Sequence, residues 1–394
     1  MAELVEWLKS SFWNEKFWFP EGKSWKLLEN VPVGKYYPQV SDLYMIIPMA
    51  VLLTFIRFVF ERYVARPIAK YHGLREGRVL YPERSVVLEK AFKKLKNPDN
   101  KQLQDLTKRT DFTLRQVERW FRKRRNLDRA SEIKKFTETA WRFLFYFLIF
   151  VYGFITQTQK PWFYDTAHCW IDWPLHHVTD DMYWYYMVSF GFYFSLIFSL
   201  FLDVRRKDFG EQVVHHITTI LLMFLSWCNN FLRMGSLILV LHDAVDYWME
   251  GAKLAKYLKY DRLCDTLFVI FAIVWFFTRL LLYPIKILHA IFIIAPQFCG
   301  MAPVYYPYVG LLSCLQVLHL IWFYLICKAA YIAIRTGKIQ KDSRSETEEP
   351  VSSEEERGRG NGGGGVDHQK NNGKQHNNID TNANQRINHK KINS

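Results

Sequence analysis

Seven long apolar stretches alternate with polar connections along the chain. They cover approximately residues 43–64, 137–157, 182–202, 211–228, 234–250, 263–283 and 305–328. Each holds roughly 17–24 residues, enough for one helix to cross a hydrocarbon core of about 30 Å. The pattern predicts an all-α, polytopic membrane helix bundle of about seven spans. A shorter apolar piece, residues 285–295, lies between Pro284 and Pro296, so we expect it to be re-entrant or interfacial.

Basic residues are distributed unevenly among the connections. Residues 65–142 hold 22 Lys and Arg against 10 Asp and Glu, which is +12 of the chain's net +14. The connections 203–210 and 251–262 carry three and four basic residues, whereas 158–181, 229–233 and 284–304 carry one each. Basic loops tend to stay in the cytosol. We therefore expect a lumenal N-terminus and a cytosolic C-terminus.

The same pattern divides the chain into five parts. We expect a lumenal N-terminal segment (1–42), a first transmembrane helix (43–64), a cytosolic three-helix domain (65–136), a polytopic membrane domain (137–334) and a disordered cytosolic tail (335–394). Residues 1–30 contain no signal-peptide core, so the first span is expected to act as its own signal anchor.

The tail has few apolar residues to bury and is rich in Ser, Glu, Gly and Asn. Four serines precede acidic residues, as an acidophilic kinase requires: Ser343, Ser345, Ser352 and Ser353. We expect either phosphorylation there or a plain solubilising tail.

Composition narrows the class of protein. The mean hydropathy of −0.11 would suit a soluble basic protein, but 17% of the residues are aromatic, which is typical of membrane proteins. Only six cysteines occur, too sparse for a disulfide-stapled miniprotein. Cys169 and Cys299 would both face the lumen, where a disulfide is permitted; the sequence does not decide whether they pair.

The basic loop contains three short amphipathic patterns. Leu88, Phe92, Leu95, Leu103 and Leu106 have the spacing of two helices. The third begins near Thr113 and presents an apolar stripe of Val117, Trp120 and Phe121.

This loop resembles a homeodomain through its Trp120-Phe121 and Arg124-Arg125 pairs. Lys123, however, stands where a homeodomain has its adenine-reading Asn. We therefore expect DNA binding to be absent and favour a folded basic domain that faces anionic lipid or a cytosolic partner.

Ionisable residues inside apolar spans are costly and indicate function. They gather in two neighbouring stretches, as His215-His216 in one and His242-Asp243, Asp246 and Glu250 in the other. His215 and Asp246 each lie four residues inside the cytosolic end of their span, so both should sit about 6 Å below one surface. A carboxylate beside an imidazole is an arrangement for general-base or nucleophilic catalysis.

Two other interpretations stay open. His215, His216, His242 and Asp246 could bind a single metal ion, although the spaced histidine boxes of membrane di-iron enzymes do not occur. The cluster could also be an interhelical hydrogen-bond network. A lone histidine such as His289 or His319 is predicted to be structural. We expect no metal.

These residues belong to a longer pattern that resembles the Lag1 motif of ceramide synthases, within the TLC domain family. The pattern reads Arg205-Arg-Lys-Asp-Phe209, His215-His216, Ser226-Trp, Asn230, Arg233, Gly235, His242-Asp243, Asp246 and Glu250. The resemblance covers about residues 12–346, and the homeobox-like loop is similar to that of certain animal members. It implies transfer of a fatty acyl group from acyl-CoA to a sphingoid long-chain base, with no cofactor beyond the co-substrate.

The resemblance also implies roles for individual residues. We expect His215 to accept the acyl group, His216 to assist or to donate to the oxyanion, and Asp243 and Asp246 to orient the imidazoles. Direct attack by the amine, with a histidine as base, is the other route. Substrate-binding residues are expected to be Arg205, Arg206 and Lys207 beside the CoA head group, and Asn230, Arg233 and His242 within the membrane domain.

The resemblance also implies residence in the endoplasmic reticulum membrane and homo- or heterodimers with related synthases. The preferred acyl-chain length is not readable from the sequence. The functional alternatives are a non-catalytic lipid sensor or trafficking protein and a membrane-tethered homeobox regulator.

Overall fold

The structure is a computed structural model that describes residues 3, 6, 10–29, 34–74, 81–127, 131–203 and 208–336. Within these ranges the chain forms helices joined by turns and short extended stretches, with no β-strand. The predicted CoA-binding residues Arg205, Arg206 and Lys207 lie outside the described residues. So do the four predicted phosphorylation sites and the predicted disordered tail.

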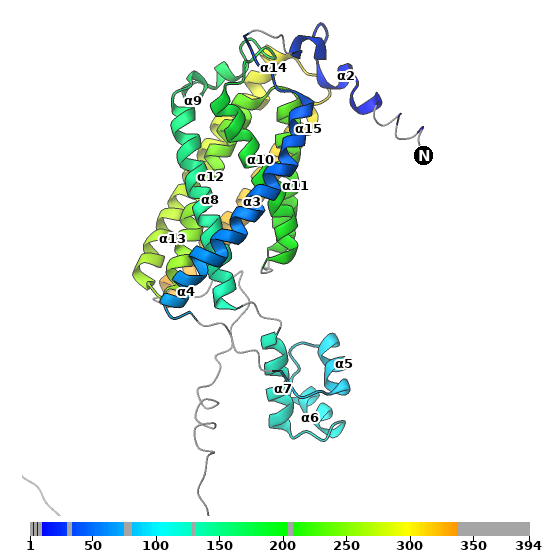
Figure 1. Ribbon diagram of the computed structural model, residues 1–394, viewed down its shortest axis with the longest axis vertical. Helices are drawn as coiled ribbons and strands as arrows, with labels where there is room; N and C mark the ends of the chain where they lie inside the picture. Colours follow the sequence, from blue (N-terminus) through cyan, green and yellow to red (C-terminus); the bar gives the residue numbers. More distant parts are fainter. Residues whose placement is uncertain are drawn as a thin grey trace, which may run out of the picture. The chain divides into compact units, whose positions relative to one another are not determined.

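Each of the seven predicted spans corresponds to a helix of the bundle (Figure 1). In chain order these are α3 (Ile46–Phe60), continued by η3 (Glu61–Ala65) and α4 (Arg66–Tyr71), α8 (Glu132–Thr158), α10 (Asp180–Leu202), α11 (Phe209–Cys228), α12 (Leu232–Tyr257), α13 (Asp261–Trp275) with its continuation, and α15 (Tyr305–Thr336).

Four helices in the described ranges are long and apolar enough to cross a membrane. They are Val40–Tyr71, the run that ends with α8, Asp261–Cys299 and Tyr305–Arg335. Helices α10, α11 and α12 are not among them, and α11 and α12 carry the polar residues that the sequence singled out. The all-α membrane bundle is confirmed, whereas the count of seven spans stays a prediction.

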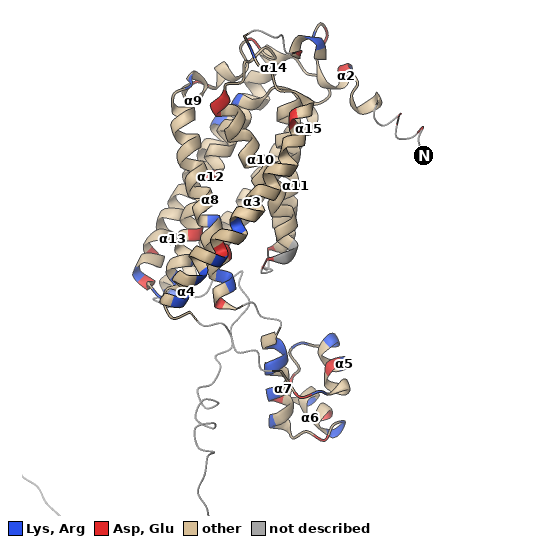
Figure 2. Ribbon diagram, in the orientation of Figure 1, with Lys and Arg blue, Asp and Glu red and all other residues tan. Residues whose placement is uncertain are grey.

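Helix α12 is central to the bundle. It packs against α8, α13 and α11, while α10 packs against α3 and α11, and α15 packs against α11. Gly235 on α12 allows this close approach, because a Cβ there would lie 2.7 Å from Ser226 Oγ and 2.8 Å from Tyr186 Oη. Figure 2 shows charged residues gathered toward the end of the bundle where α4 lies. We call this the charged end and the opposite one the aromatic end.

The prediction that residues 285–295 form a re-entrant piece is wrong, whereas their position at a membrane interface stays a prediction. Residues 261–299 form one continuous helix, in which α13 leads into η5 (Phe276–Leu288), η6 (Ala290–Ile294) and α14 (Ala295–Cys299). Both η5 and η6 are π-helical, and Pro284 lies inside η5. A proline in an α-helix collides with the carbonyl four residues earlier. The wider π turn moves that carbonyl away, so the helix passes through Pro284.

The N-terminal segment is part of the bundle rather than an appendage. Its short helices are α2 (Glu15–Trp18), η1 (Trp25–Leu28) and η2 (Val40–Met45). Trp18 is fully buried, and the backbone of Phe17 accepts a hydrogen bond from Val304 N (3.0 Å). Trp227 on α11 donates to the Gln39 carbonyl (2.8 Å). The apolar core of the bundle therefore extends to residues well before the first span.

The aromatic end also includes α9 (Pro161–Tyr164) and η4 (Thr166–Cys169). Lys23 Nζ donates to the Trp173 carbonyl (2.7 Å) and lies 4.2 Å from the centre of the Trp173 ring. The six cysteines are all free, including the buried Cys169 and Cys299. The disulfide that the sequence left open is thus not formed.

Residues 81–127 form the predicted three-helix unit. Its helices are α5 (Val86–Lys94), α6 (Asn100–Lys108) and α7 (Leu114–Leu127). Its core consists of Leu88, Phe92, Leu103, Val117, Trp120 and Phe121. The predicted stripe of α7 is confirmed. Of the five positions predicted for the first two helices, Leu88, Phe92 and Leu103 are buried, Leu106 packs against this core, and Leu95 is exposed because α5 ends just before it.

Because His176, at the aromatic end, is buried, we predict that acid lowers the free energy of unfolding. Burial first, and then the positive charge of Arg233, lower its pKa from 6.5 to about 4. The unfolded chain therefore binds a proton between pH 6.5 and about 4 that the folded chain does not. The contribution of neutral His176 to the free energy of unfolding is fully present above pH 6.5. It is lost as the pH falls to about 4, and the total loss is up to about 3 kcal/mol.

Substitution of His176 by Gln should flatten this dependence. The amide can still donate to the Ile171 carbonyl, which accepts from His176 Nε2 at 2.6 Å. Thermal unfolding of detergent-solubilised protein between pH 4 and 7 is the measurement, with the exposed His289→Gln as the matched control. An unchanged slope in His176→Gln would contradict the prediction.

Candidate active site

Helices α11 and α12 are antiparallel neighbours that bring the predicted polar residues together. A tight turn at residues 229–231 joins them, and Asn230 adopts a positive φ of 53° there. The Asn230 side chain donates to the carbonyls of Pro174 (2.6 Å) and His176 (2.8 Å). This turn sets the register in which His215 and His216 on α11 face His242 and Asp246 on α12.

Asn230 and Arg233 lie at the aromatic end, away from the histidines. Arg233 donates to the His168 carbonyl (2.7 Å), and its guanidinium carbon lies 4.6 Å from the centre of the Trp162 ring. Thirteen positions separate His215 from the end of α11 at Cys228, about 20 Å along the helix, and Asn230 lies beyond that end. The structure thus gives Asn230 and Arg233 contacts that hold the turn and does not place them beside His215.

An apolar cavity extends from the aromatic end into the bundle. Aromatic side chains line it at that end, and His215 and His242 line it within the bundle. Its other lining residues include Trp18, Trp170, Trp173, Tyr193, Leu222, Met223, Ile238, Leu239, Ile291, Cys299, Gly300, Tyr308, Leu312 and Leu315. Such a lining fits a hydrocarbon chain rather than a polar ligand.

A second, polar cavity lies toward the charged end. His215, His216, Asp246 and His319 line it, together with Arg142, Asp203, Asp208, Gln212, Glu250, Trp275, Arg279 and Trp322. His215 is therefore shared between the two cavities. A group held by this imidazole would have an apolar channel on one side and a charged one on the other.

The two adjacent histidines keep reactive nitrogens available. Their ring centres lie 5.6 Å apart, and His215 stands edge-on to Trp322 at 5.3 Å. Among the described residues, Nδ1 of His215 and Nδ1 of His216 have no hydrogen-bond partner, although both atoms are buried. Buried polar atoms are usually paired, so each unpaired nitrogen calls for a functional explanation.

Asp243 and Asp246 differ in their surroundings. Asp243 is buried and accepts a hydrogen bond from Tyr185 Oη (3.3 Å). Asp246 lines the polar cavity and lies 3.8 Å from a guanidinium nitrogen of Arg279. No hydrogen bond within the described ranges joins His215 or His216 to either carboxylate. Asp246 and His215 share a cavity instead of a contact.

His242 contacts a histidine from the last helix. Its Nδ1 bonds to the Ile238 carbonyl (2.7 Å), and its Nε2 lies 3.2 Å from Nε2 of His319 on α15. Arg279, buried in η5, donates to the His242 carbonyl (2.8 Å) and lies over the Trp275 ring. The predicted site thus acquires partners from two helices whose polar residues are isolated in the sequence.

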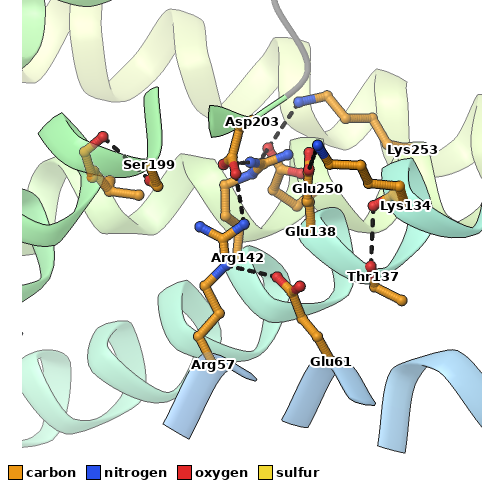
Figure 3. A network of polar contacts seen from close by, with 11 residues as sticks. Arg57, Glu61, Lys134, Thr137, Glu138, Arg142, Ser199, Asp203, Glu250 and Lys253 are labelled. Carbon is orange, nitrogen blue, oxygen red and sulfur yellow. Dashed lines mark hydrogen bonds and ion pairs between the residues drawn. The ribbon is translucent and has the colours of Figure 1, made fainter. Parts of the chain in front are cut away.

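A network of ion pairs borders the polar cavity at the charged end (Figure 3). Asp203, at the end of α10, pairs with Arg57 of α3 (2.7 Å) and Arg142 of α8 (3.2 Å). Arg142 also reaches Glu250 (3.5 Å), which pairs with Lys253 (2.8 Å). The network ties four helices together immediately before the basic run 205–207.

Metal binding gains no geometric support. Within the described ranges, no group of three or more His, Cys, Asp or Glu side chains is placed to hold a metal ion.

Comparison with known proteins assigns the family. The TLC domain model matches residues 135–328, and the homeodomain model matches residues 76–130. Human ceramide synthase 5 is 42% identical over 357 residues, which is 90% of each chain. Human ceramide synthase 3 is 42% identical over 86% of this chain and 88% of its own length, and human ceramide synthase 4 is 40% identical over 90% and 89%. The chain belongs to the ceramide synthase family.

In this member of the ceramide synthase family, the sequence did not predict that three further residues would line the polar cavity. His319 was predicted to be structural because it is a single histidine in an apolar stretch, yet it lines the polar cavity and contacts His242. Arg279 and Arg142 were likewise assigned no role. The signal was available for Arg279, since a lone arginine inside a span indicates a function or a buried partner.

Proposed function

We propose that this chain transfers a fatty acyl group from acyl-CoA to the amine of a sphingoid long-chain base, which yields (dihydro)ceramide and CoA. Membership of the ceramide synthase family supports the reaction class. The observation that carries the proposal at residue level is the position of His215 between an apolar and a polar cavity. The acyl chain would occupy the apolar cavity, and the thioester would meet the imidazole where the two cavities adjoin.

The chemistry follows from this placement. A neutral imidazole nitrogen of His215 attacks the thioester carbonyl, and the C–S bond breaks. The hydrogen on the other ring nitrogen passes to the departing thiolate, so CoA leaves as the thiol and a neutral acyl-imidazole remains. The amine of the long-chain base then attacks that carbonyl and releases the imidazole. Direct attack of the amine on the thioester is the alternative route, with His215 as base. His216, whose Nδ1 has no hydrogen-bond partner among the described residues, would assist His215 or donate to the oxyanion.

Orientation supports the same assignment of substrates. The excess of basic residues in 65–142 favours a cytosolic charged end, and the endoplasmic reticulum is the membrane that the family implies. Polyanionic CoA would then approach the polar cavity from the cytosol, beside the basic run Arg205, Arg206 and Lys207. The N-terminus would be lumenal and the C-terminus cytosolic, and the chain would form homo- or heterodimers.

An acyltransferase assay with purified protein tests the proposal. The protein is given acyl-CoA of several chain lengths with a long-chain base, and ceramide is quantified by mass spectrometry. The expected result is that ceramide forms from acyl-CoA of at least one of the chain lengths. Absence of product across all lengths, from protein shown to be folded, would sink the proposal.

The two routes are separated by the intact mass of the protein after incubation with acyl-CoA alone. We expect an adduct of one acyl group, which disappears when the long-chain base is added. No adduct under conditions of normal turnover would favour direct attack instead.

A further inference from the structure

The pair formed by His242 and His319 has fixed hydrogen positions. The Ile238 carbonyl can only accept, so the nitrogen 2.7 Å from it, Nδ1 of His242, carries a hydrogen. In a neutral ring Nε2 of His242 is then an acceptor. Nε2 of His319, 3.2 Å away, must donate to it.

Consequently Nδ1 of His319 is a bare acceptor. Among the described residues it has no hydrogen-bond partner, although His319 is only 1% exposed. The opposite tautomer of His319 would set two lone pairs against each other at 3.2 Å, so the backbone carbonyl of Ile238 determines, through His242, which nitrogen of His319 is free.

The surroundings of the pair place it beside the reacting centre. His242 lines the apolar cavity and His319 the polar cavity, and His215 lines both. Tyr283 stands edge-on to both rings, with ring centres 5.7 Å from His242 and 4.9 Å from His319. Tyr283 donates its own hydrogen to the Leu312 carbonyl (3.0 Å), so it holds the pair without occupying the free nitrogen.

We propose that His319 is the proton acceptor for the amine substrate, through its Nδ1. This rests on the proposed acyl transfer, because only the sphingoid base brings an ammonium group that must lose a proton before it can attack. The assignment extends the site to the last helix, which carries no residue of the pattern that resembles the Lag1 motif.

The proton balance is complete. The ammonium group passes one proton to Nδ1 of His319, which becomes an imidazolium whose Nε2–H still donates to His242. The resulting neutral amine attacks the acyl carbonyl and forms the C–N bond. The C–N bond to His215 breaks, and the second amine proton goes to the departing imidazole. His319 then returns its proton to solvent through the polar cavity that it lines.

A comparison of two amine substrates shows whether His319 accepts a proton or only supports the structure. One is an ordinary long-chain base, and the other carries enough fluorine on the carbons next to the amine-bearing carbon that the measured pKa of its ammonium group lies below the assay pH. Both are measured as kcat/KM for the amine in wild type, His319→Gln and the control His289→Gln, whose histidine is exposed. The glutamine amide keeps a donor toward His242, and His319→Asn offers the same comparison should the longer variant not fold.

We expect His319→Gln to lower kcat/KM for the ordinary base by about a hundredfold, the usual scale of general-base catalysis. The fluorinated base should lose less than about fivefold, because it needs no deprotonation before attack. An equal loss with both amines, or no loss with either, would overturn the assignment. An inactive wild type would overturn the proposed function instead, so the two failures are distinguishable.

Discussion

Replacement of His215 by alanine is expected to lower acyl transfer by at least about a thousandfold while the bundle stays folded. The imidazole lines both cavities, and the helix backbone around it keeps its contacts when the ring is removed. Ceramide formation by the purified variant is the measurement, and the adduct formed with acyl-CoA alone should disappear as well. Retention of even a tenth of the wild-type rate would refute the assignment.

Two further variants show whether the loss of activity is specific to the site around His215. His289→Ala removes an exposed histidine of the same membrane domain and should leave the rate within about twofold of wild type. Asp246 is better tested as Asn than as Ala, because both changes remove the charge but only asparagine keeps an oxygen that can accept a hydrogen bond from the buried Arg279. Asp246→Asn keeps the volume, so a fall in rate without loss of folding would place the carboxylate in the reaction.

Replacement of Arg142 by methionine is expected to destabilise the bundle by about 3 kcal/mol. The guanidinium lies between Asp203 and Glu250, whose side chains are 14% and 2% exposed. Removal of one partner from a buried ion pair costs about 3–5 kcal/mol in general. The lower figure applies because Arg57 still pairs with Asp203 and Lys253 with Glu250.

Thermal unfolding in detergent, followed by tryptophan fluorescence, measures this loss. The control is Lys256→Met, which breaks an ion pair with Asp261 that is 38% and 59% exposed and should cost at most about 1 kcal/mol. Similar losses in the two variants would show that the Figure 3 network contributes no more than a surface pair.

Residue patterns predicted the central part of the site because its members lie close together in sequence. His215 and His216 are adjacent, and Asp246 follows His242 by one helical turn, so periodicity and the short connection at residues 229–233 suffice to bring them together. His319, Arg279 and Arg142 reach the same cavity from three other helices. Their positions depend on how helices rotate against one another, which no local pattern encodes.

The prediction of a re-entrant piece failed for a local reason. Pro284 reads as a helix breaker, and nothing in its neighbourhood shows that the turn around it is π-helical. Asn230 and Arg233 were assigned to substrate because they belong to the same motif as the histidines, and that assignment stays a prediction. In the structure their side chains donate to the carbonyls of residues 168–176 and so stabilise the turn between α11 and α12.

The way residues 10–45 pack has a practical consequence for engineered hybrids. The TLC domain model begins at residue 135, yet Trp18 and Pro20 line the apolar cavity, and backbone atoms of Phe17 and Gln39 bond to the last connection and to α11. In a chimaera that exchanges only residues 135–328 between two family members, one parent would supply Trp18 and Pro20 and the other parent would supply the rest of the cavity lining. The cavity of such a hybrid would be that of neither parent, so the exchange should include the N-terminal segment as well.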